Sequence, residues 1–250
     1  MIDLSGKVTL ITGGSRGIGA ACVKLFSQAG SGVAFTYKNR KDEADKLIAV
    51  CSGKKVIAYK VDMESENDIN LCVEKAIRDF GKIDILVHNA GIWNDGTIEN
   101  MTLEHWNELM RINLTSNFLF VKAVLPSMKK NKFGRIINIS STAGQRGEAF
   151  HSHYAASKGG MISFTKSLAV ELAPFNITTN SVAPGWVDTE MNDGVFADLE
   201  VKEAARKGIP LGRIPPAEDI AGPALFLASD LARHINGEIL NVNGGSVLCG

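Results

Sequence analysis

The chain has 250 residues and a mass of 26.8 kDa, with 45% hydrophobic and 22% charged residues, which is typical of one globular domain. Lys plus Arg and Asp plus Glu each number 27, and this balance excludes proteins that bind nucleic acid or anionic membranes through a general basic field. Four scattered cysteines without metal-site spacing, and no apolar run of membrane-spanning length, favour a soluble protein of the reducing cytoplasm.

Short β-branched segments alternate with longer segments of helical periodicity along the chain. The predicted strands are 8–12, 33–37, 56–61, 83–87, 135–139, 177–182 and 238–242. The predicted helices are 17–29, 40–51, 66–80, 102–130 and 153–173. Strands that are apolar throughout are buried on both faces, and helical crossovers make consecutive strands parallel. The predicted fold is a single-domain α/β, Rossmann-type doubly wound parallel sheet of about seven strands, with helices on both faces.

A glycine-rich turn joins the first predicted strand to the first predicted helix. Its glycines at 13, 17 and 19 form a G-x-x-x-G-x-G pattern. Glycine permits unusual backbone angles and close backbone approach, while the N–H groups at the start of a helix attract a pyrophosphate. The turn therefore predicts a dinucleotide site. The residues expected to bind the cofactor here are Gly13, Ser15, Arg16, Gly17, Ile18 and Gly19.

The residues after the second predicted strand distinguish NAD from NADP. An acidic residue at this point binds the ribose 2′-OH of NAD, whereas the 2′-phosphate of NADP requires cations. Here Tyr37 is followed by Lys38 and Arg40, and Arg16 of the glycine-rich turn can approach the same point. We expect NADP(H) as the cofactor, with these three cations around its 2′-phosphate. The alternative is a solvated basic start of a helix.

The third predicted strand ends at Asp62, which is followed by Met63. Both are expected to lie beside the cofactor. The Asp62 carboxylate either caps the next segment or accepts a hydrogen bond from the adenine amino group, and the sequence leaves both interpretations open.

The segment 188–216 interrupts the alternation of strands and helices. It carries three glycines and three prolines around a short helical segment, 199–207. A long irregular insertion in a compact domain is often a lid over a binding site, and the alternative is an ordered surface excursion. We expect one domain over 1–250, with 188–216 as a substrate lid.

Further motifs follow the order in which they occur in short-chain dehydrogenases/reductases, and the chain resembles that family over essentially its whole length. The residues that carry this resemblance, besides the glycine-rich turn, are Asn89-Ala90-Gly91, Asn113, Ser141, Tyr154-x-x-x-Lys158, Pro184-Gly185, Val187 and Thr189. The resemblance implies that the first triplet stabilises the fourth strand beside the cofactor. It also implies that the residues from 184 to 189 lie at the nicotinamide.

The resemblance also implies hydride transfer between a nicotinamide and a carbonyl carbon by an enzyme with four catalytic residues. Tyr154 would exchange the proton of the alcohol, and Ser141 would bind the substrate oxygen. Lys158 would hold the nicotinamide ribose, and Asn113 would position a water. Ser141, rather than Ser140, is assigned because it lies thirteen residues before Tyr154, which is the usual separation in the fatty-acid reductases of the family that the chain resembles.

Tyr154 and Lys158 are four residues apart, so on a helix their side chains share one face. Lowering the pKa of a tyrosine from about 10 to neutrality requires roughly 4 kcal/mol. A cation about 4 Å away in a medium of effective dielectric ~20 supplies about that amount. We therefore expect Lys158 to lower the pKa of Tyr154.

Three histidines lie near these motifs. His151 and His153 form an H-x-H pattern without a nearby third ligand, so we expect no metal and place both at the edge of the substrate pocket. His88 precedes the Asn-Ala-Gly triplet, where the family more often has Asn, and its effect is not predicted.

Among subfamilies, the chain most resembles 3-oxoacyl-(acyl carrier protein) reductases, including its ending at 237–245. The resemblance implies a small-molecule or acyl-thioester carbonyl substrate. Phe175 stands where those reductases carry a basic residue that docks the carrier protein, although Lys129, Lys130 and Lys132 offer a basic surface nearby. A dehydrogenase of sugars, polyols or small secondary alcohols is the alternative, and a non-catalytic NADP-binding regulator is a more remote one.

Two predicted helices, 114–128 and 154–173, are apolar over more than one face. In the second, Ala155, Gly159 and Ser163 form a line of small residues that lets another helix pack closely. The resemblance implies a homotetramer, and we expect these helices at a subunit interface.

Overall fold

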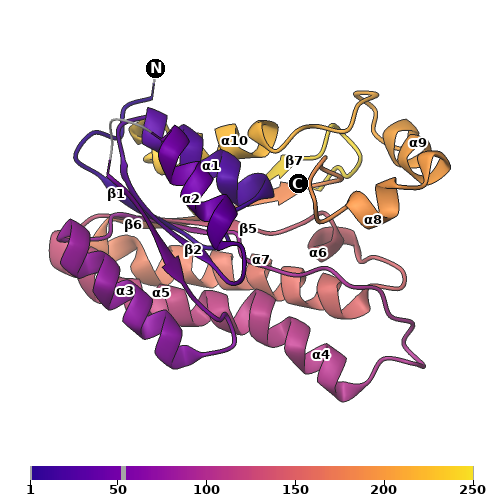
Figure 1. Cartoon of the computed structure of the whole chain (residues 1–250), viewed down its shortest axis with the longest axis horizontal. Coiled ribbons are helices and arrows are strands. Elements are labelled where there is room, and N and C mark those ends of the chain that lie inside the picture. The colour runs from indigo at the N-terminus through magenta and orange to yellow at the C-terminus, as the bar shows by residue number, and fades with distance from the viewer. Residues whose placement is uncertain (1, 52–54, 250) are drawn as a thin grey trace.

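The sheet is the centre of the computed structural model, which describes residues 2–51 and 55–249 (Figure 1). Its strand order is β3-β2-β1-β4-β5-β6-β7, and every neighbouring pair is parallel. The strands are β1 (Val8–Ile11), β2 (Gly32–Tyr37), β3 (Val56–Lys60), β4 (Ile85–His88), β5 (Gly134–Ile139), β6 (Ile177–Pro184) and β7 (Ile239–Val242). The predicted fold class is confirmed.

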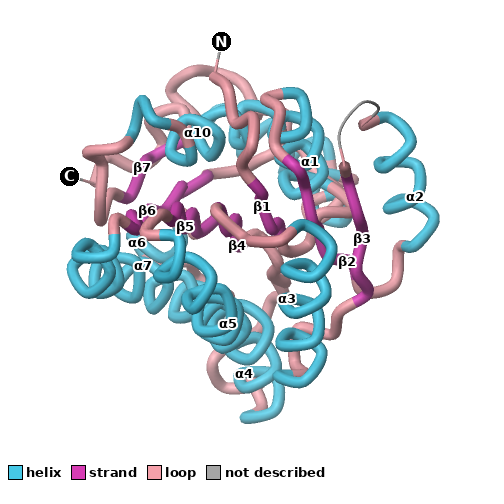
Figure 2. Tube along the Cα trace, turned by 90° about the vertical axis from the view of Figure 1, so that its left-hand side faces the viewer, coloured by secondary structure: helices cyan, strands magenta, loops and turns pink. Residues whose placement is uncertain are grey.

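Helices cover both faces of the sheet, as Figure 2 shows. One apolar layer joins the sheet to α1 (Gly17–Gln28), α2 (Lys41–Val50) and α10 (Glu218–Ala228). The other layer joins it to α3 (Glu66–Phe80), α5 (Ser116–Asn131) and α7 (Ser152–Leu172). The remaining α-helices of the described residues are α4 (Leu103–Met110), α6 (Ala143–Arg146), α8 (Asp193–Phe196) and α9 (Leu199–Lys207).

The chain order places a crevice at the carboxyl ends of β1 and β4. From β1 the chain proceeds outward through β2 and β3, and then crosses back to start the other half of the sheet at β4. In doubly wound sheets, ligands bind where the strand order reverses in this way. The glycine-rich turn after β1 and the Asn-Ala-Gly triplet after β4 both lie at this point.

Besides the one-turn helices α6 and α8, which were not predicted, two longer helical regions differ from the prediction. The single helix expected at 102–130 is α4 and α5 joined by a π-helical segment, η1 (Arg111–Thr115). The helix α10 had no predicted counterpart. Its first turn is acidic, which favours a helix start, but Gly222 and Pro223 in its interior conceal the pattern. Burial of its apolar face against α1 and the sheet overrides these unfavourable residues.

The four cysteines are unpaired: Cys22, Cys51 and Cys72 are buried and Cys249 is exposed. None of the helices in the described part of the chain combines the length and apolar character that crossing a membrane requires.

Candidate active site

The glycine-rich turn is held by β2 and closes tightly on itself. Gly13 N–H donates to Thr36 Oγ1 at 3.0 Å, and Gly14 N–H donates to the Thr36 carbonyl at 2.8 Å. Gly13 has a φ of 64°, which favours glycine. A Cβ at Gly19 would lie 2.1 Å from the Gly13 carbonyl oxygen. Gly19 therefore permits the turn to pack against the start of α1 rather than lining the cavity itself.

The Asn-Ala-Gly triplet fastens the end of β4 to this turn. Thr12 Oγ1 accepts from the N–H groups of Asn89, at 3.0 Å, and Ala90, at 2.9 Å. In the opposite direction, Asn89 Nδ2 donates to the carbonyls of Thr12, at 3.2 Å, and Gly13, at 3.1 Å. The two strand ends on either side of the crevice are thus joined by four hydrogen bonds.

A cavity of about 440 Å³ opens beside this junction and extends to the end of β2. Thirteen of the predicted cofactor residues line it: Gly13, Ser15, Arg16, Gly17, Ile18, Tyr37, Lys38, Arg40, Met63, Asn89, Ala90, Gly91 and Thr189. The narrow glycine cradle, the helix N-terminus and the cations at the far end fit a dinucleotide. Asp62 is not among the lining residues.

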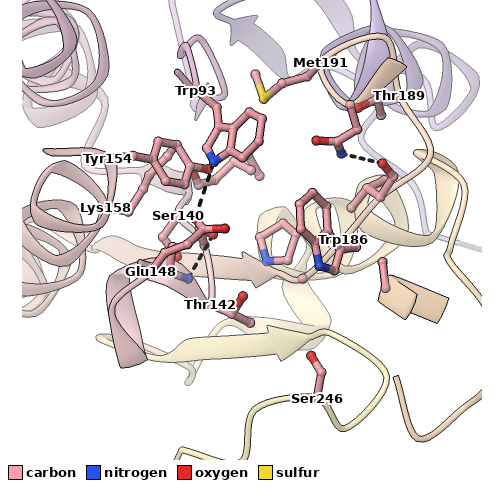
Figure 3. A pocket seen from close by; sticks show the side chains of 18 of the residues that line it. Trp93, Ser140, Thr142, Glu148, Tyr154, Lys158, Trp186, Thr189, Met191 and Ser246 are labelled. Carbon is pink, nitrogen blue, oxygen red and sulfur yellow. Dashed lines mark hydrogen bonds between the residues drawn. The ribbon is translucent and has the colours of Figure 1, made fainter. Parts of the chain in front are cut away.

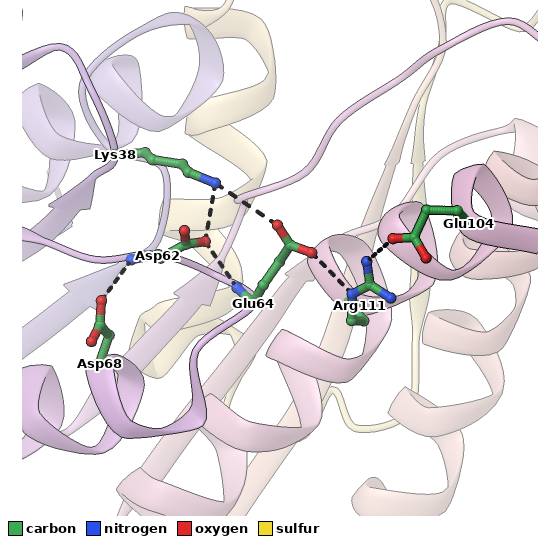
Figure 4. Close-up of polar contacts among 6 residues, drawn as sticks. All are labelled: Lys38, Asp62, Glu64, Asp68, Glu104 and Arg111. Atoms are coloured by element: carbon green, nitrogen blue, oxygen red, sulfur yellow. Dashed lines mark hydrogen bonds and ion pairs between the residues drawn. The ribbon is translucent and has the colours of Figure 1, made fainter.

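Lys38 differs from its predicted surroundings, because two carboxylates neutralise it (Figure 4). Its Nζ lies 3.1 Å from Asp62 and 3.9 Å from Glu64. Glu64 also pairs with Arg111 at 2.9 Å. Burial alone would raise the pKa of Asp62, but its hydrogen bond from Glu64 N–H and the ammonium of Lys38 outweigh this effect and lower it. Asp62 accepts from Glu64 N–H at 3.1 Å and so caps the segment that follows β3; a hydrogen bond from the adenine amino group stays a prediction.

A second cavity, of about 280 Å³, adjoins the first and is lined by three of the four predicted catalytic residues, Ser141, Tyr154 and Lys158. Figure 3 shows Tyr154 and Lys158 in its wall. Ser141 acts on Tyr154 by lowering the pKa of the phenol, and Ser141 Oγ accepts from Ala143 N–H at 3.1 Å. The neighbouring Ser140 hydroxyl is used differently, since it donates to the Val182 carbonyl at 3.0 Å. Ser141 is the member of the pair whose hydroxyl meets the tyrosine.

Burial is the main influence on the pKa values of Tyr154 and Lys158. It raises the pKa of Tyr154 to about 12, with a further contribution from Glu148, while the Ser141 hydrogen bond acts in the opposite direction. Burial also lowers the pKa of Lys158 to about 8. The expected lowering of the pKa of Tyr154 by Lys158 is not observed. The Lys158 ammonium donates to the Ile139 carbonyl at 2.8 Å, 5.7 Å from the centre of the Tyr154 ring, so desolvation of the phenol prevails.

The predicted nicotinamide residues Pro184, Gly185 and Val187 line this second cavity. Thr189 lines both cavities. The cofactor cleft and the catalytic pocket therefore meet at the carboxyl end of β6 and the segment that follows it.

Asn113 is buried in η1 and lines neither cavity. Its Oδ1 accepts from Ile92 N–H at 2.8 Å, and its Nδ2 donates to the Ile92 carbonyl at 3.0 Å and to Ser157 Oγ at 3.2 Å. This side chain therefore clamps the segment after β4 to η1 and α7.

Several pocket residues have no counterpart in the sequence analysis. Trp93, Glu148 and Trp186 line the catalytic cavity. The two indole rings meet edge to face at 6.1 Å, and Trp93 Nε1 donates to Glu148 at 3.4 Å. His151 stacks on Trp93 at 4.3 Å, outside the cavity wall. The only signal in the sequence is the position of each tryptophan within two residues after a family motif, which is too weak alone.

The insertion 188–216 lies over the catalytic cavity, with α8 and α9 projecting at one side of the molecule (Figure 1). Its ends are joined by Asp188 N–H, which donates to the Pro215 carbonyl at 2.9 Å. The residues that it contributes to the cavity wall are Thr189, Met191, Asn192, Ala204, Ala205, Gly208 and Ile209.

Two other predicted features have contacts within the chain. At Gly159 an added Cβ would lie 3.2 Å from the Gly144 carbonyl oxygen, so this small residue permits close packing of α6 on α7. The Phe175 ring is partly exposed and lies 4.4 Å from Lys129 Nζ. Among the described residues, no group of three or more metal-ligating side chains occurs.

Comparisons with known proteins give consistent matches. A family model described as enoyl-(acyl carrier protein) reductase matches residues 13–246. The chain is 42% identical to the 3-oxoacyl-[acyl-carrier-protein] reductase FabG of Aquifex aeolicus over 98% of each chain. It is 43% identical to the Haemophilus influenzae reductase of the same name, over 98% of this chain and 100% of that protein. A solved dehydrogenase/reductase from Sinorhizobium meliloti covers 98% of this chain and 97% of its own, with a TM-score of 0.91 and 33% identity.

Proposed function

Because the chain belongs to the short-chain dehydrogenase/reductase family, we propose that it is an NADPH-dependent oxidoreductase that reduces 3-oxoacyl thioesters to the 3-hydroxy form. The observation that carries this proposal is that Ser141, Tyr154 and a buried Lys158 line one cavity, which adjoins the cofactor cavity. The printed function of the relatives supports the same substrate class.

The catalytic residues of this chain act on the substrate oxygen. A bound nicotinamide supplies a hydride to the carbonyl carbon. Tyr154 is protonated at neutral pH because its pKa is raised to about 12, so it can donate its proton to the oxygen as negative charge develops there. Ser141 donates a second hydrogen bond to that oxygen. Lys158 contributes positive charge beneath the site and is positioned by the Ile139 carbonyl.

For the cofactor, we infer that Arg16 and Arg40 bind the 2′-phosphate of NADPH and that Lys38 contributes little. Both arginines line the cofactor cavity, and neither has an ion-pair partner within residues 2–51 and 55–249. Lys38 is already neutralised by Asp62 and Glu64. Replacing either arginine with alanine should weaken NADPH binding about tenfold relative to NADH. Equal losses in Lys38→Ala would contradict this assignment.

The function is tested by following NADPH oxidation with acetoacetyl, longer 3-oxoacyl and 2-enoyl thioesters. We expect turnover of the 3-oxoacyl thioesters and none of the 2-enoyl thioesters. Tyr154→Phe should lower kcat 10²–10⁴-fold with NADPH binding unchanged. Ser141→Ala should lower kcat strongly and Ser140→Ala should not. Turnover confined to the enoyl thioesters would refute the proposal.

An alternative reaction, dehydrogenation of a sugar or polyol, is favoured by one observation. Glu148 lines the catalytic cavity, and its carboxylate can accept hydrogen bonds from substrate hydroxyl groups. The same assay run in reverse with NADP⁺ and a panel of polyols distinguishes this reaction. Firm NADPH binding without turnover of any carbonyl would instead favour a non-catalytic regulator.

We further propose a cytoplasmic homotetramer that receives its substrate from an acyl carrier protein. The unpaired buried cysteines suit a reducing compartment. Lys129, Lys130 and Lys132 offer cations to an acidic carrier, with Phe175 beneath the first of them. Sedimentation should give about four times the 26.8 kDa mass of the chain. Reversing the charge of Lys129 should raise KM for the carrier-bound substrate and leave KM for a free pantetheine thioester unchanged.

A further inference from the structure

His88 is the last residue of β4, and it is fully buried. Its Nδ1 is 3.2 Å from Thr12 Oγ1, next to the glycine-rich turn. Its Nε2 is 3.4 Å from Ser116 Oγ, at the start of α5. The imidazole thus joins two parts of the chain that are distant in sequence.

The surrounding hydrogen bonds define which nitrogen of His88 carries the proton. Thr12 Oγ1 already accepts from Asn89 N–H and Ala90 N–H, so its own hydrogen is available to donate to His88 Nδ1. Ser116 Oγ donates to the Ile112 carbonyl at 2.6 Å, so it can accept from His88 Nε2–H. Every donor then has an acceptor, and the bonds run in one direction from the Asn-Ala-Gly triplet to η1.

The environment of His88 keeps it neutral. Burial, together with the charge of Lys158, lowers the pKa of His88 to about 3, while the Asn113 backbone acts weakly in the opposite direction. A second proton on Nδ1 would also oppose the hydrogen of the Thr12 hydroxyl. The imidazole therefore keeps one tautomer at physiological pH.

We propose that His88 is a positioning residue that sets the width of the cofactor cleft. The hydrogen-bonded chain ends at Ile112, which lines the same cofactor cavity as the glycine-rich turn. The next residue, Asn113, clamps Ile92, which also lines that cavity. His88 thus connects the wall that begins at Thr12 with the wall that carries Ile112. This inference rests on the proposed function only in requiring that the cavity binds a dinucleotide.

The test compares two replacements of His88 of similar size. His88→Gln keeps polar atoms able to replace the imidazole nitrogens, whereas His88→Leu keeps the volume and removes both hydrogen bonds. NADPH binding, measured by fluorescence titration without substrate, should weaken about tenfold in the Leu variant and less than about threefold in the Gln variant. Equal affinities of the two variants would overturn the proposal, because a role in packing alone does not distinguish them.

Two further variants keep the test informative if His88→Leu does not fold. Ser116→Ala removes one end of the chain and should weaken NADPH binding about threefold, but add nothing in the His88→Leu background. Additive effects, or no effect of Ser116→Ala alone, would overturn the proposal. Phe120→Leu is the matched packing control, because this buried ring lies 6.1 Å from the His88 ring without hydrogen-bonding it. It should lower Tm and leave NADPH affinity within twofold.

These outcomes are distinguishable from failure of the proposed function. If the wild-type protein binds NADPH but turns over no 3-oxoacyl thioester, the substrate assignment fails while the His88 measurements remain valid. If the wild-type protein binds NADH but not NADPH, the cofactor assignment fails and the His88 variants are compared with NADH instead; if it binds neither dinucleotide, the role of His88 in setting the cleft is refuted as well.

Discussion

Replacing Lys158 with methionine should make the protein inactive but more stable at neutral pH. Lys158 is 4% exposed, and burial lowers its pKa from 10.5 to about 8. A difference of about 2.5 pH units corresponds to roughly 3.4 kcal/mol of destabilisation at pH 7. The hydrogen bond to Ile139, which methionine cannot make, offsets about 1 kcal/mol. The expected net gain is about 2 kcal/mol, or roughly 4–8 °C in Tm.

The pH dependence identifies the cause of this gain. Between pH 8 and 10.5 the unfolded chain binds a proton at Lys158 that the folded chain has released, so wild-type stability rises with pH across this window. The advantage of Lys158→Met should therefore be full at pH 7 and fall below about 1 kcal/mol at pH 10. Urea unfolding of both proteins at the two pH values measures this difference.

A matched control separates burial from a general effect of removing a charge. Lys166 lies two helical turns further along α7 and is exposed, so Lys166→Met should change stability by less than about 0.5 kcal/mol at either pH. A Lys158→Met variant that is less stable than wild type at pH 7, or whose gain is the same at pH 10, would refute the reasoning. A gain in stability with a loss of activity in Lys158→Met is expected if the buried charge is retained for catalysis.

Two further predictions concern the cofactor turn and the catalytic tyrosine. Gly19→Ala should destabilise the protein by about 1–3 kcal/mol and abolish NADPH binding, because its Cβ would lie 2.1 Å from the Gly13 carbonyl oxygen; thermal unfolding and fluorescence titration measure both effects. Gly222→Ala, where no atom lies within 4 Å of the added Cβ, should instead leave binding unchanged and stabilise α10 by about 0.5–1 kcal/mol, and similar losses in both variants would contradict the steric argument. Glu148→Gln should lower the pKa of Tyr154, because the carboxylate raises it. The rate of alcohol oxidation, which requires the deprotonated tyrosine, should then rise at lower pH than in wild type; an unshifted or upward-shifted profile would show that Glu148 does not act on Tyr154.

Local features could be predicted from the sequence because their geometry is contained in a few consecutive residues. The glycine-rich turn is one example, since the backbone freedom of Gly13 and Gly17 is a property of those residues alone. The four-residue spacing of Tyr154 and Lys158 is another, since helix periodicity by itself puts them on one face. The alternation of buried strands with helices likewise predicted a parallel sheet, and the seven-stranded sheet confirms it.

Partners distant in sequence were decided only by the tertiary structure. Lys38 meets Asp62 and Glu64 because β2 and β3 are neighbours, so a residue predicted to bind phosphate is held by carboxylates. The formation of α10 likewise depends on tertiary contacts. Gly222 and Pro223 disfavour a helix, and packing of its apolar face against α1 compensates for them.

The pKa values of Tyr154 and Lys158 show most directly why the sequence does not predict the chemistry of the site. The sequence by itself determined that Tyr154 and Lys158 share a helix face, and Coulomb's law predicted a lowered pKa for the phenol. Only the folded environment determined how much water each group loses and which acceptor the ammonium finds. Burial depends on all the surrounding elements together, and it raises the pKa of Tyr154 to about 12. The same elements place the Ile139 carbonyl of β5 where the Lys158 ammonium donates to it.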